Sequence, residues 1–382
     1  METRKLYYED CHLKTFPCRI LSCLETDRGW EIVTDATAFY PEGGGQACDL
    51  GELGAVRVLD VRERGATVVH LCDGPLPEGA EVTGGIDWPR RFDLMQQHTG
   101  EHIVSGLVNR NWGYHNVGFH VGADVITIDF DGPIPADALE ALELEANRAV
   151  WENLPVEVTI PAPEELARTV YRTKRALDWP VRIVRVPGYD SCACCGVHVA
   201  RTGEIGLIKL LSVMSFRGGT RMEMACGGRA LGLVNTAFNQ NRLVSQAFSA
   251  KWQETGAAAQ RMNAALEEEK LRCVGLYRRL YTHIAREYTA AGDVLRFEEG
   301  LEPVQIRELA DAIAQVCGGR AAVFSGEDGA GYAYALVTHQ GTLREFGKAM
   351  TAALDGRGGG KDGFQQGRVR ANRAQIEEFF RN

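Results

Sequence analysis

The stretch from residue 236 to about residue 290 is the part of the sequence that most restricts the fold. It contains no proline and few other helix breakers, so it predicts one or two long helices, with coiled-coil pairing as one option. The residues on either side of it show different patterns. The sequence therefore predicts a helical connector over 236–290 between two folded regions.

The two flanking regions both mix helices and strands. Residues 1–85 are rich in glycine and strand formers, as in "GWEIVTD" and "AEVTGGIDW", which is typical of a small β-barrel or curled sheet. Residues 86–235 combine helical segments with strands such as "DVITIDFDG", and we expect an α/β domain with an antiparallel sheet. Residues 291–382 predict a C-terminal α/β domain. The expected fold class is therefore α+β.

The composition is that of an ordinary globular protein, with 45% hydrophobic and 24% charged residues in a chain of 382. No apolar run approaches the ~20 residues that span a bilayer, and the first residues lack the apolar centre of a signal peptide. These features predict a soluble, cytoplasmic protein without a membrane partner. Eleven cysteines, an odd number, favour reduced thiols, and a "CACC" cluster near a histidine indicates metal before disulfide.

The net charge of −9 argues against a general nucleic-acid coat, because such binding depends on neutralising phosphates. It leaves room for a specific RNA bound by a local basic patch. The segment 168–185 is rich in arginine and includes Arg172, Lys174 and Arg175, interleaved with Tyr171 and Trp179. This segment has two interpretations, a surface that contacts a nucleic-acid backbone and an ordinary solvated face.

Two histidines lie four residues apart in the expected helix, within "QQHTGEHIVSG". His98 and His102 would project from one helix face and could share a metal. The simpler interpretation is a pair of surface histidines. "HTGEH" also satisfies the inverted zinc-peptidase pattern H-x-x-E-H, with Glu101 as the general base. Two ligands do not complete a site, so further ligands must come from elsewhere in the chain.

The segment "CACCGVH" supplies a second pair of metal-binding residue types. Cys194 and His198 are four residues apart, and thiolate and imidazole are both good zinc ligands. A buried cysteine cluster beside a surface histidine is the alternative. Together the two pairs can supply a four-ligand set, and a metallopeptidase would not normally include the cysteine.

Two glycine-rich segments have less specific patterns. "FYPEGGGQ", residues 39–46, predicts a tight turn or a close approach of backbone to a ligand. "GGGKDG", residues 358–363, is not a phosphate loop of the GxxxxGK[ST] kind, because Asp355 and Asp362 stand where glycine and serine or threonine are required. A flexible or RNA-contacting glycine loop remains, with Lys361 as the candidate contact.

The ordered set "FYPEGGGQ", "HTGEH", "CCGVH" and "GTRMEMACGGRAL" resembles the editing domain of alanyl-tRNA synthetase and its free-standing relatives, the AlaX proteins. The resemblance covers roughly residues 1–235, and "LDGRGGGKDGFQQG" resembles the C-terminal domain of the longer AlaX proteins. It implies a zinc-dependent editing domain over 86–235, with His98, His102, Cys194 and His198 as the metal ligands. Cys195 and Val197 depart from the family's glycine and threonine, which puts a substrate hydrogen bond at Val197 in doubt.

The resemblance also implies a function. We expect ATP-independent hydrolysis of alanine tRNA wrongly charged with serine, or with glycine, at a Zn²⁺ site. Glu42 and Gln46 match family residues, and with Thr99 they are the candidate catalytic pocket residues, because rejecting alanine requires polar contacts to the serine hydroxyl. For Thr99 the alternative is an ordinary helix residue. A homodimer through the connector and C-terminal domain is expected. The alternatives are an HxxEH zinc peptidase and a non-catalytic tRNA-binding protein.

Three cysteines lie close to His198, and the sequence favours Cys194 as the ligand. Cys194 reproduces the C-x-x-x-H spacing, with Gly196 in the family's register. Neighbouring residues of an extended chain point to opposite sides, so Cys195 would face away from the metal. Cys192 would share the side of Cys194 and is the more serious rival.

Overall fold

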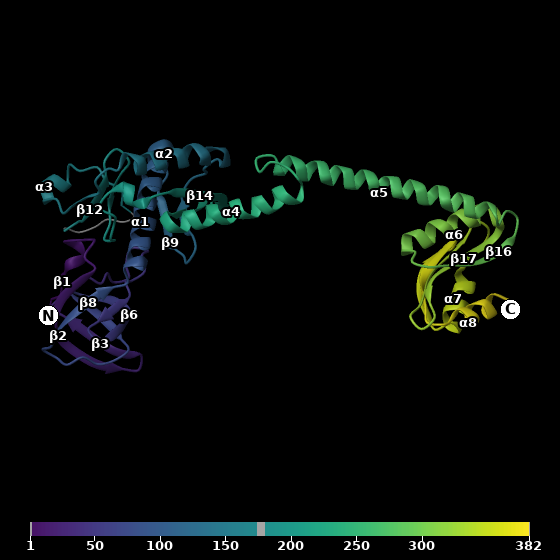
Figure 1. Ribbon diagram of the computed structural model, residues 1–382, viewed down its shortest axis with the longest axis horizontal. Coiled ribbons are helices and arrows are strands. Elements are labelled where there is room, and N and C mark those ends of the chain that lie inside the picture. Colours follow the sequence, from purple (N-terminus) through teal and green to yellow (C-terminus); the bar gives the residue numbers. More distant parts are fainter. Residues whose placement is uncertain (1, 174–179, 382) are drawn as a thin grey trace. The chain divides into compact units, whose positions relative to one another are not determined.

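The computed structural model describes residues 2–173 and 180–381, and the chain divides into two compact units, Met1–Arg242 and Leu243–Asn382 (Figure 1). Each unit has its own hydrophobic cores, and sheets and helices occur in both. The α+β class predicted from the sequence is confirmed.

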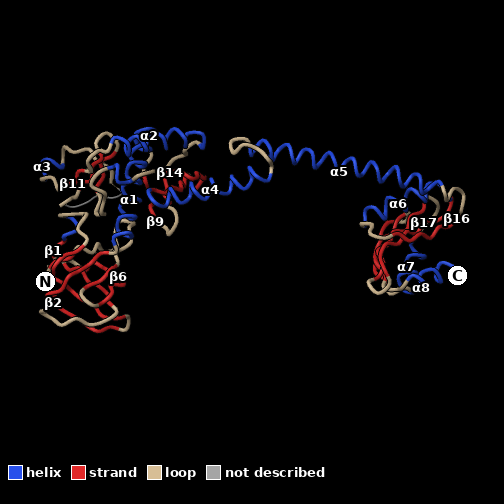
Figure 2. Tube along the Cα trace, in the orientation of Figure 1, coloured by secondary structure: helices blue, strands red, loops and turns tan. Residues whose placement is uncertain are grey.

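Six antiparallel strands near the N-terminus form a sheet that closes on itself. Their order is β2 (Thr15–Thr26), β3 (Gly29–Thr34), β7 (Thr67–Cys72), β6 (Val56–Arg64), β5 (Gly51–Leu53) and β8 (Glu81–Ile86), which bonds back to β2 as a closed barrel (Figure 2). Alternate residues of β2, Phe16, Cys18 and Ile20, point into its core, as the two-residue period of a strand requires. The short strands β1 (Arg4–Lys5) and β4 (Ala36–Thr37) pair beside it, and the 3-10 helix η1 spans Leu6–Tyr8.

The helix α1 (Trp88–Trp112) follows the barrel directly. Asp87 caps its first turn by accepting a hydrogen bond from the Arg90 N–H, and Gly113 ends it in a left-handed conformation. Every residue from 97 to 108 is buried. The "HTGEH" segment therefore lies inside the protein, and the interpretation of His98 and His102 as surface residues is wrong.

An antiparallel sheet of four strands packs against α1. Its order is β14 (Ile208–Phe216), β15 (Gly219–Cys226), β10 (Ile126–Phe130) and β9 (Asn116–Val121), and α2 (Leu139–Glu152) packs with it around one core. A smaller sheet holds β11 (Glu157–Thr159), β12 (Ile183–Val186) and β13 (Asp190–Ala193). The remaining short helices of this unit are η2 (Ala136–Ala138), α3 (Pro163–Leu166) and η3 (Thr202–Ile205).

The helix α4 (Gly227–Ala247) contains the boundary between the two units, and α5 (Thr255–Arg286) follows after a short break. The second unit has a five-stranded sheet in the order β16 (Gly292–Glu298), β17 (Gly318–Glu327), β18 (Gly331–Thr338), β20 (Phe364–Val369) and β19 (Gly356–Lys361). Residues of α5 and α6 (Pro303–Cys317) share a core on one sheet face, and residues of α7 (Arg344–Ala353) and α8 (Arg373–Arg381) share another on the opposite face.

Three sequence expectations need correction. The segment "GGRAL", expected as a strand, forms the first turns of α4, so the helical stretch starts at Gly227. The expected glycine loop is instead the paired strands β19 and β20. The helix α6 is not among the expected elements, although its buried residues Ile306, Leu309 and Ile313 recur at helical spacing.

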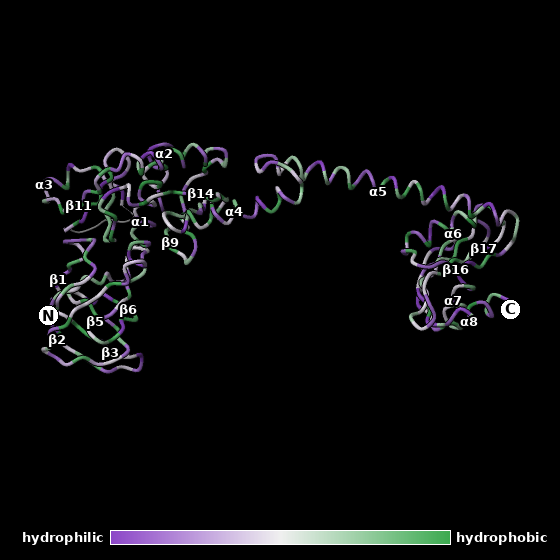
Figure 3. The backbone as a smooth tube through the Cα atoms, in the orientation of Figure 1, coloured by the Kyte–Doolittle hydropathy of each residue, from purple (hydrophilic) through white to green (hydrophobic). Residues whose placement is uncertain are grey.

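Hydrophilic and hydrophobic residues are interspersed along α5 (Figure 3). Large apolar side chains, among them Leu266, Leu271 and Leu276, are at least half exposed within the unit to which α5 belongs. Across the described residues, none of the helices has the length and apolar character that crossing a membrane requires.

Candidate metal centre

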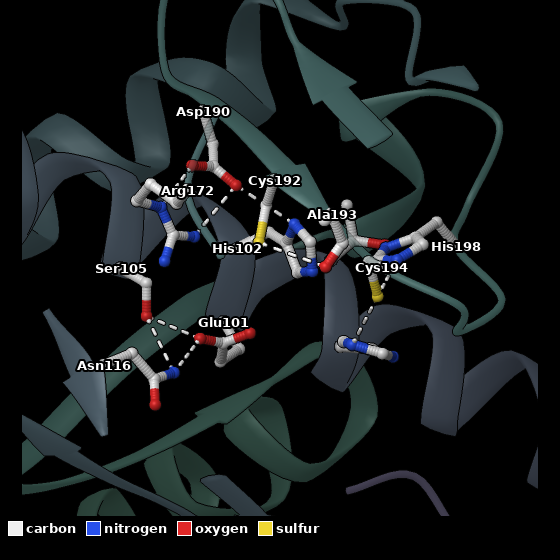
Figure 4. A network of polar contacts seen from close by, with 12 residues as sticks. Glu101, His102, Ser105, Asn116, Arg172, Asp190, Cys192, Ala193, Cys194 and His198 are labelled. Carbon is white, nitrogen blue, oxygen red and sulfur yellow. Dashed lines mark hydrogen bonds and ion pairs between the residues drawn. The ribbon is translucent and has the colours of Figure 1, made fainter. Parts of the chain in front are cut away.

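Four side chains from two distant segments meet inside the first unit. His98 and His102 come from α1, and Cys194 and His198 come from the loop after β13, and one ligand atom of each lies within 4.8 Å of the others. The Cys194 Sγ atom lies 3.4 Å from His98 Nε2 and 3.5 Å from His198 Nε2 (Figure 4). The structure therefore brings together the four residues that the sequence proposed as ligands.

Each imidazole of the cluster contacts an oxygen atom through its Nδ1 atom. His98 Nδ1 lies 2.8 Å from Gln46 Oε1, and His102 Nδ1 lies 3.0 Å from Asp190 Oδ2. Because these oxygens can only accept, Nδ1 carries the proton in the neutral form of each imidazole, and in that form Nε2 has its lone pair free for the cluster.

His198 is held in the same way by Thr99, whose Oγ1 lies 3.2 Å from its Nδ1. The Thr99 hydroxyl donates its own proton to the Met95 carbonyl, 2.8 Å away, so it accepts the proton of His198. Three imidazole nitrogens and one sulfur with oriented lone pairs form a donor set that suits zinc.

Electrostatics favour the thiolate form of Cys194. Burial opposes its ionisation, but the adjacent His98 and His102 charges outweigh burial and lower the thiol pKa well below its usual value. For His102, burial lowers the pKa, yet Cys194 and Asp190 together raise it well above the ordinary value. Burial and the neighbouring imidazoles lower the pKa of His198 to about 3. A thiolate beside imidazoles is the state in which a metal displaces protons.

Gly196 lets the ligand loop pack against α1. A Cβ atom at this position would lie 2.1 Å from His98 Cε1 and 2.4 Å from His98 Nδ1, so any side chain would push the imidazole away. Arg182 holds the same loop by donating to the Cys194 and Gly196 carbonyls, at 2.8 and 2.9 Å. Val197 is buried, and it places an apolar side chain next to the ligand His198.

The other two cysteines of the cluster are placed differently. Cys192 lies near His102 and Asp190 in a second group of three, and burial raises the pKa of its thiol. Cys195 is exposed and belongs to neither group. Geometry thus favours Cys194 as the thiol of the four-residue cluster.

A cavity of about 480 Å³ opens beside the cluster. Among the residues that line it are Gly44, Gly45, Glu101, Asn116 and Phe119, together with His98, His102 and Cys194. The "GGG" segment therefore borders the cavity with its backbone. Of the two interpretations of this segment, a tight turn and a close approach of backbone to a ligand, this position favours the second. The sequence pointed to Glu101 only as the base of a peptidase, and it gave no sign of Asn116.

The structure places Glu42, which the sequence predicted as a pocket residue, away from the cavity. Its side chain is 49% exposed and pairs with Arg62, and it is not among the residues that line the cavity. Gln46 and Thr99 are close to the cluster, but both are buried and contact ligand histidines. Neither is among the residues that line the cavity, and a catalytic role for them stays a prediction.

The four residues predicted to contact tRNA lie in different environments. Arg172 is only 15% exposed and donates to Asp190 with distances of 2.6 and 3.0 Å, so it is part of the buried network and not of an open basic face. Lys174 and Arg175 lie outside the described residues. Lys361 is exposed at the end of β19 in the second unit. The sequence analysis did not identify Asp190 as a site residue. Its position two residues before Cys192 was the only feature that could have indicated it.

Comparisons with known proteins bear on this site. Residues 181–222, which include Cys194 and His198, match the family described as "Threonyl and Alanyl tRNA synthetase second additional domain". The chain is 28% identical to the alanyl-tRNA editing protein Aarsd1-A of Xenopus laevis, over 96% of this chain and 95% of that protein. It is 26% identical to Aarsd1 of Danio rerio, over 97% and 96%. It is also 34% identical to an alanine–tRNA ligase of Pyrobaculum neutrophilum over 99% of its own length, which is 44% of the ligase.

Proposed function

Because this chain belongs to the alanyl-tRNA editing family, we propose that it hydrolyses the ester of alanine tRNA charged with the wrong amino acid, serine first and glycine second. In this reaction water adds to the ester carbonyl, the bond to the terminal ribose breaks, and the ribose oxygen takes a proton. The observation that carries the proposal is the buried cluster of three histidines and one cysteine beside a cavity. We expect the protein to act in the cytoplasm.

We propose zinc as the metal, held by His98, His102, Cys194 and His198. When bound, zinc would supply a Lewis acid for the ester carbonyl or for water. The side chains of this protein orient the site: Gln46, Asp190 and Thr99 fix the imidazoles, as described above. Their role is to hold each Nε2 lone pair toward the cluster, which keeps the ligand geometry ready before metal binds.

Replacing Asp190 with asparagine is expected to weaken zinc binding about 10- to 100-fold, because His102 loses the carboxylate that fixes its tautomer. Competition for zinc with a coloured chelator measures the change. Asp311→Asn is the matched control, since Asp311 also pairs with a histidine, His339, but at the exposed surface of the second unit. Equal zinc affinity in the Asp190→Asn variant and the wild type would contradict the orienting role.

We propose that the second unit grips tRNA without taking part in the chemistry. Lys361 is its candidate contact, because it is exposed at the tip of the glycine-rich hairpin. The exposed apolar side chains of α5 favour a homodimer formed through this helix.

The direct test compares hydrolysis of Ser-tRNA, Gly-tRNA and Ala-tRNA, all made on alanine tRNA, with and without a zinc chelator. We expect Ser-tRNA to be hydrolysed at least about 100-fold faster than Ala-tRNA, which is the discrimination that a site with hydrogen bonds to a substrate hydroxyl provides. Chelation should abolish the activity. Hydrolysis of Ala-tRNA as fast as Ser-tRNA would contradict the proposed selectivity and would point to Val197, and full activity without metal would contradict the zinc site.

A further inference from the structure

Glu101 presents one engaged and one unengaged oxygen at the cavity beside the cluster. The residue is 4% exposed and lies on α1 between His98 and His102. Ser105 Oγ and Asn116 Nδ2 both donate to its Oε1 atom, each at 2.5 Å. Among the described residues no donor reaches Oε2, which points away from that pair (Figure 4). The carboxylate is thus fixed in orientation with one acceptor left over.

Within the described residues, the two arginines that line the cavity have other partners. Arg172 forms its two short contacts with Asp190, and Arg182 donates to loop carbonyls while its guanidinium lies 4.6 Å from the centre of the Tyr8 ring. Within the described part of the chain, no lysine, arginine or histidine nitrogen lies within ion-pair distance of Glu101. Arg172 lies close enough for the Glu101 charge to act on it, but it forms no ion pair with Glu101. A buried carboxylate without an ion-pair partner is costly, and a cationic ligand in direct contact would lower that cost.

The substrate class of the proposed function carries such a cation. An aminoacyl ester has a free α-amino group, whose ammonium form is well populated at neutral pH and lies only two bonds from the ester carbonyl carbon. Resting on the proposed function, we propose that Glu101 Oε2 binds the α-ammonium group of the aminoacyl ester. This contact sets the ester near the cluster, and it excludes tRNA whose amino acid is blocked at nitrogen, because an amide N–H carries no charge.

The test compares Ser-tRNA with N-acetyl-Ser-tRNA on the same alanine tRNA, using wild type, Glu101→Gln and Glu101→Asp. We expect Glu101→Gln to lose roughly 100-fold in kcat/KM for Ser-tRNA, the usual scale for removing one partner of a desolvated charge pair. Its slow hydrolysis of the acetylated substrate should stay within about 3-fold of wild type, so that the preference for a free amine disappears. Glu101→Asp keeps the charge but shortens the side chain, and its preference should be intermediate.

A binding measurement separates this inference from the proposed function. The probe is adenosine carrying serine through a stable 3′-amide, with the serine amine free or acetylated. Wild type should bind the free amine at least about 30-fold more tightly, and Glu101→Gln should bind both forms alike. If wild type shows this preference but does not hydrolyse Ser-tRNA, the proposed function fails and the inference stands.

Zinc content and thermal unfolding check the integrity of each variant, and Glu140→Gln, an exposed glutamate at the start of α2, serves as the matched control. Glu140→Gln should behave as wild type in both assays. An equal loss on both substrates with unchanged probe binding would overturn the inference and assign Glu101 to proton transfer. An unchanged preference in Glu101→Gln would overturn it outright.

Discussion

Replacing Cys194 with serine should lower zinc affinity by more than about 100-fold and reduce Ser-tRNA hydrolysis by at least as much. The loss of a direct ligand should exceed the 10- to 100-fold effect of removing a group that only orients one. A serine hydroxyl does not ionise near neutral pH, whereas the surroundings of Cys194 lower its thiol pKa well below the usual value. Metal analysis of the purified variant and a single-turnover deacylation assay measure the two effects.

Cys192→Ser is the matched control, because it makes the same substitution two residues away. Cys192 lies near His102 and Asp190 but outside the four-residue cluster, and burial raises the pKa of its thiol. This variant should keep about one zinc per chain. Zinc loss in Cys192→Ser together with zinc retention in Cys194→Ser would refute the ligand assignment.

Replacing Asp49 with asparagine should lower the free energy of unfolding of the first unit by about 3–5 kcal/mol, the cost of leaving a buried partner charge uncompensated. Arg91 is fully buried near the start of α1, and its Nε lies 2.8 Å from Asp49 Oδ1. Asp49 also accepts the Tyr40 N–H, and Arg91 also donates to the Ala38 carbonyl. This pair therefore joins the barrel segment to the helix that carries both histidines. Urea denaturation followed by circular dichroism measures the change.

Asp73→Asn provides the comparison for this stability effect. Asp73 pairs with Arg57, whose side chain is 73% exposed, so the same substitution there should cost no more than about 1 kcal/mol. If Asp49→Asn unfolded at the same urea concentration as Asp73→Asn, the buried pair would not have the structural role proposed for it.

The residues of the cluster could be predicted from the sequence largely because of their local spacing. Four residues along a helix return to nearly the same face, so the pairing of His98 with His102 follows from their spacing alone. The cysteine at four residues from His198 followed from spacing and from the family resemblance. The long proline-free stretch likewise indicated the helices α4 and α5, although it did not locate the start of α4 at Gly227 or the break between the two helices.

Segments without a clear period were less accessible. The hairpin β19–β20 is rich in glycine, which lacks the side chains that would show a two-residue alternation, and β20 is fixed by pairing with β18. Glu42 matched a family motif, yet its side chain points toward Arg62 at the surface. A motif identifies a backbone segment, whereas the direction of one side chain in a turn depends on its neighbours.

The sequence by itself determined the α+β class and the two pairs His98/His102 and Cys194/His198, because the period of a helix and short-range spacing are properties of the chain, and the family resemblance joined the pairs into one set. Only the tertiary structure decided that Gln46, Asp190 and Thr99 hold the three imidazoles, that Arg172 is buried against Asp190, and that Glu101 keeps one oxygen for the cavity. The physical reason is distance along the chain. Gln46 lies 52 residues from His98, and Thr99 lies 99 residues from His198, so these contacts exist only after the barrel, helix and ligand loop have packed together.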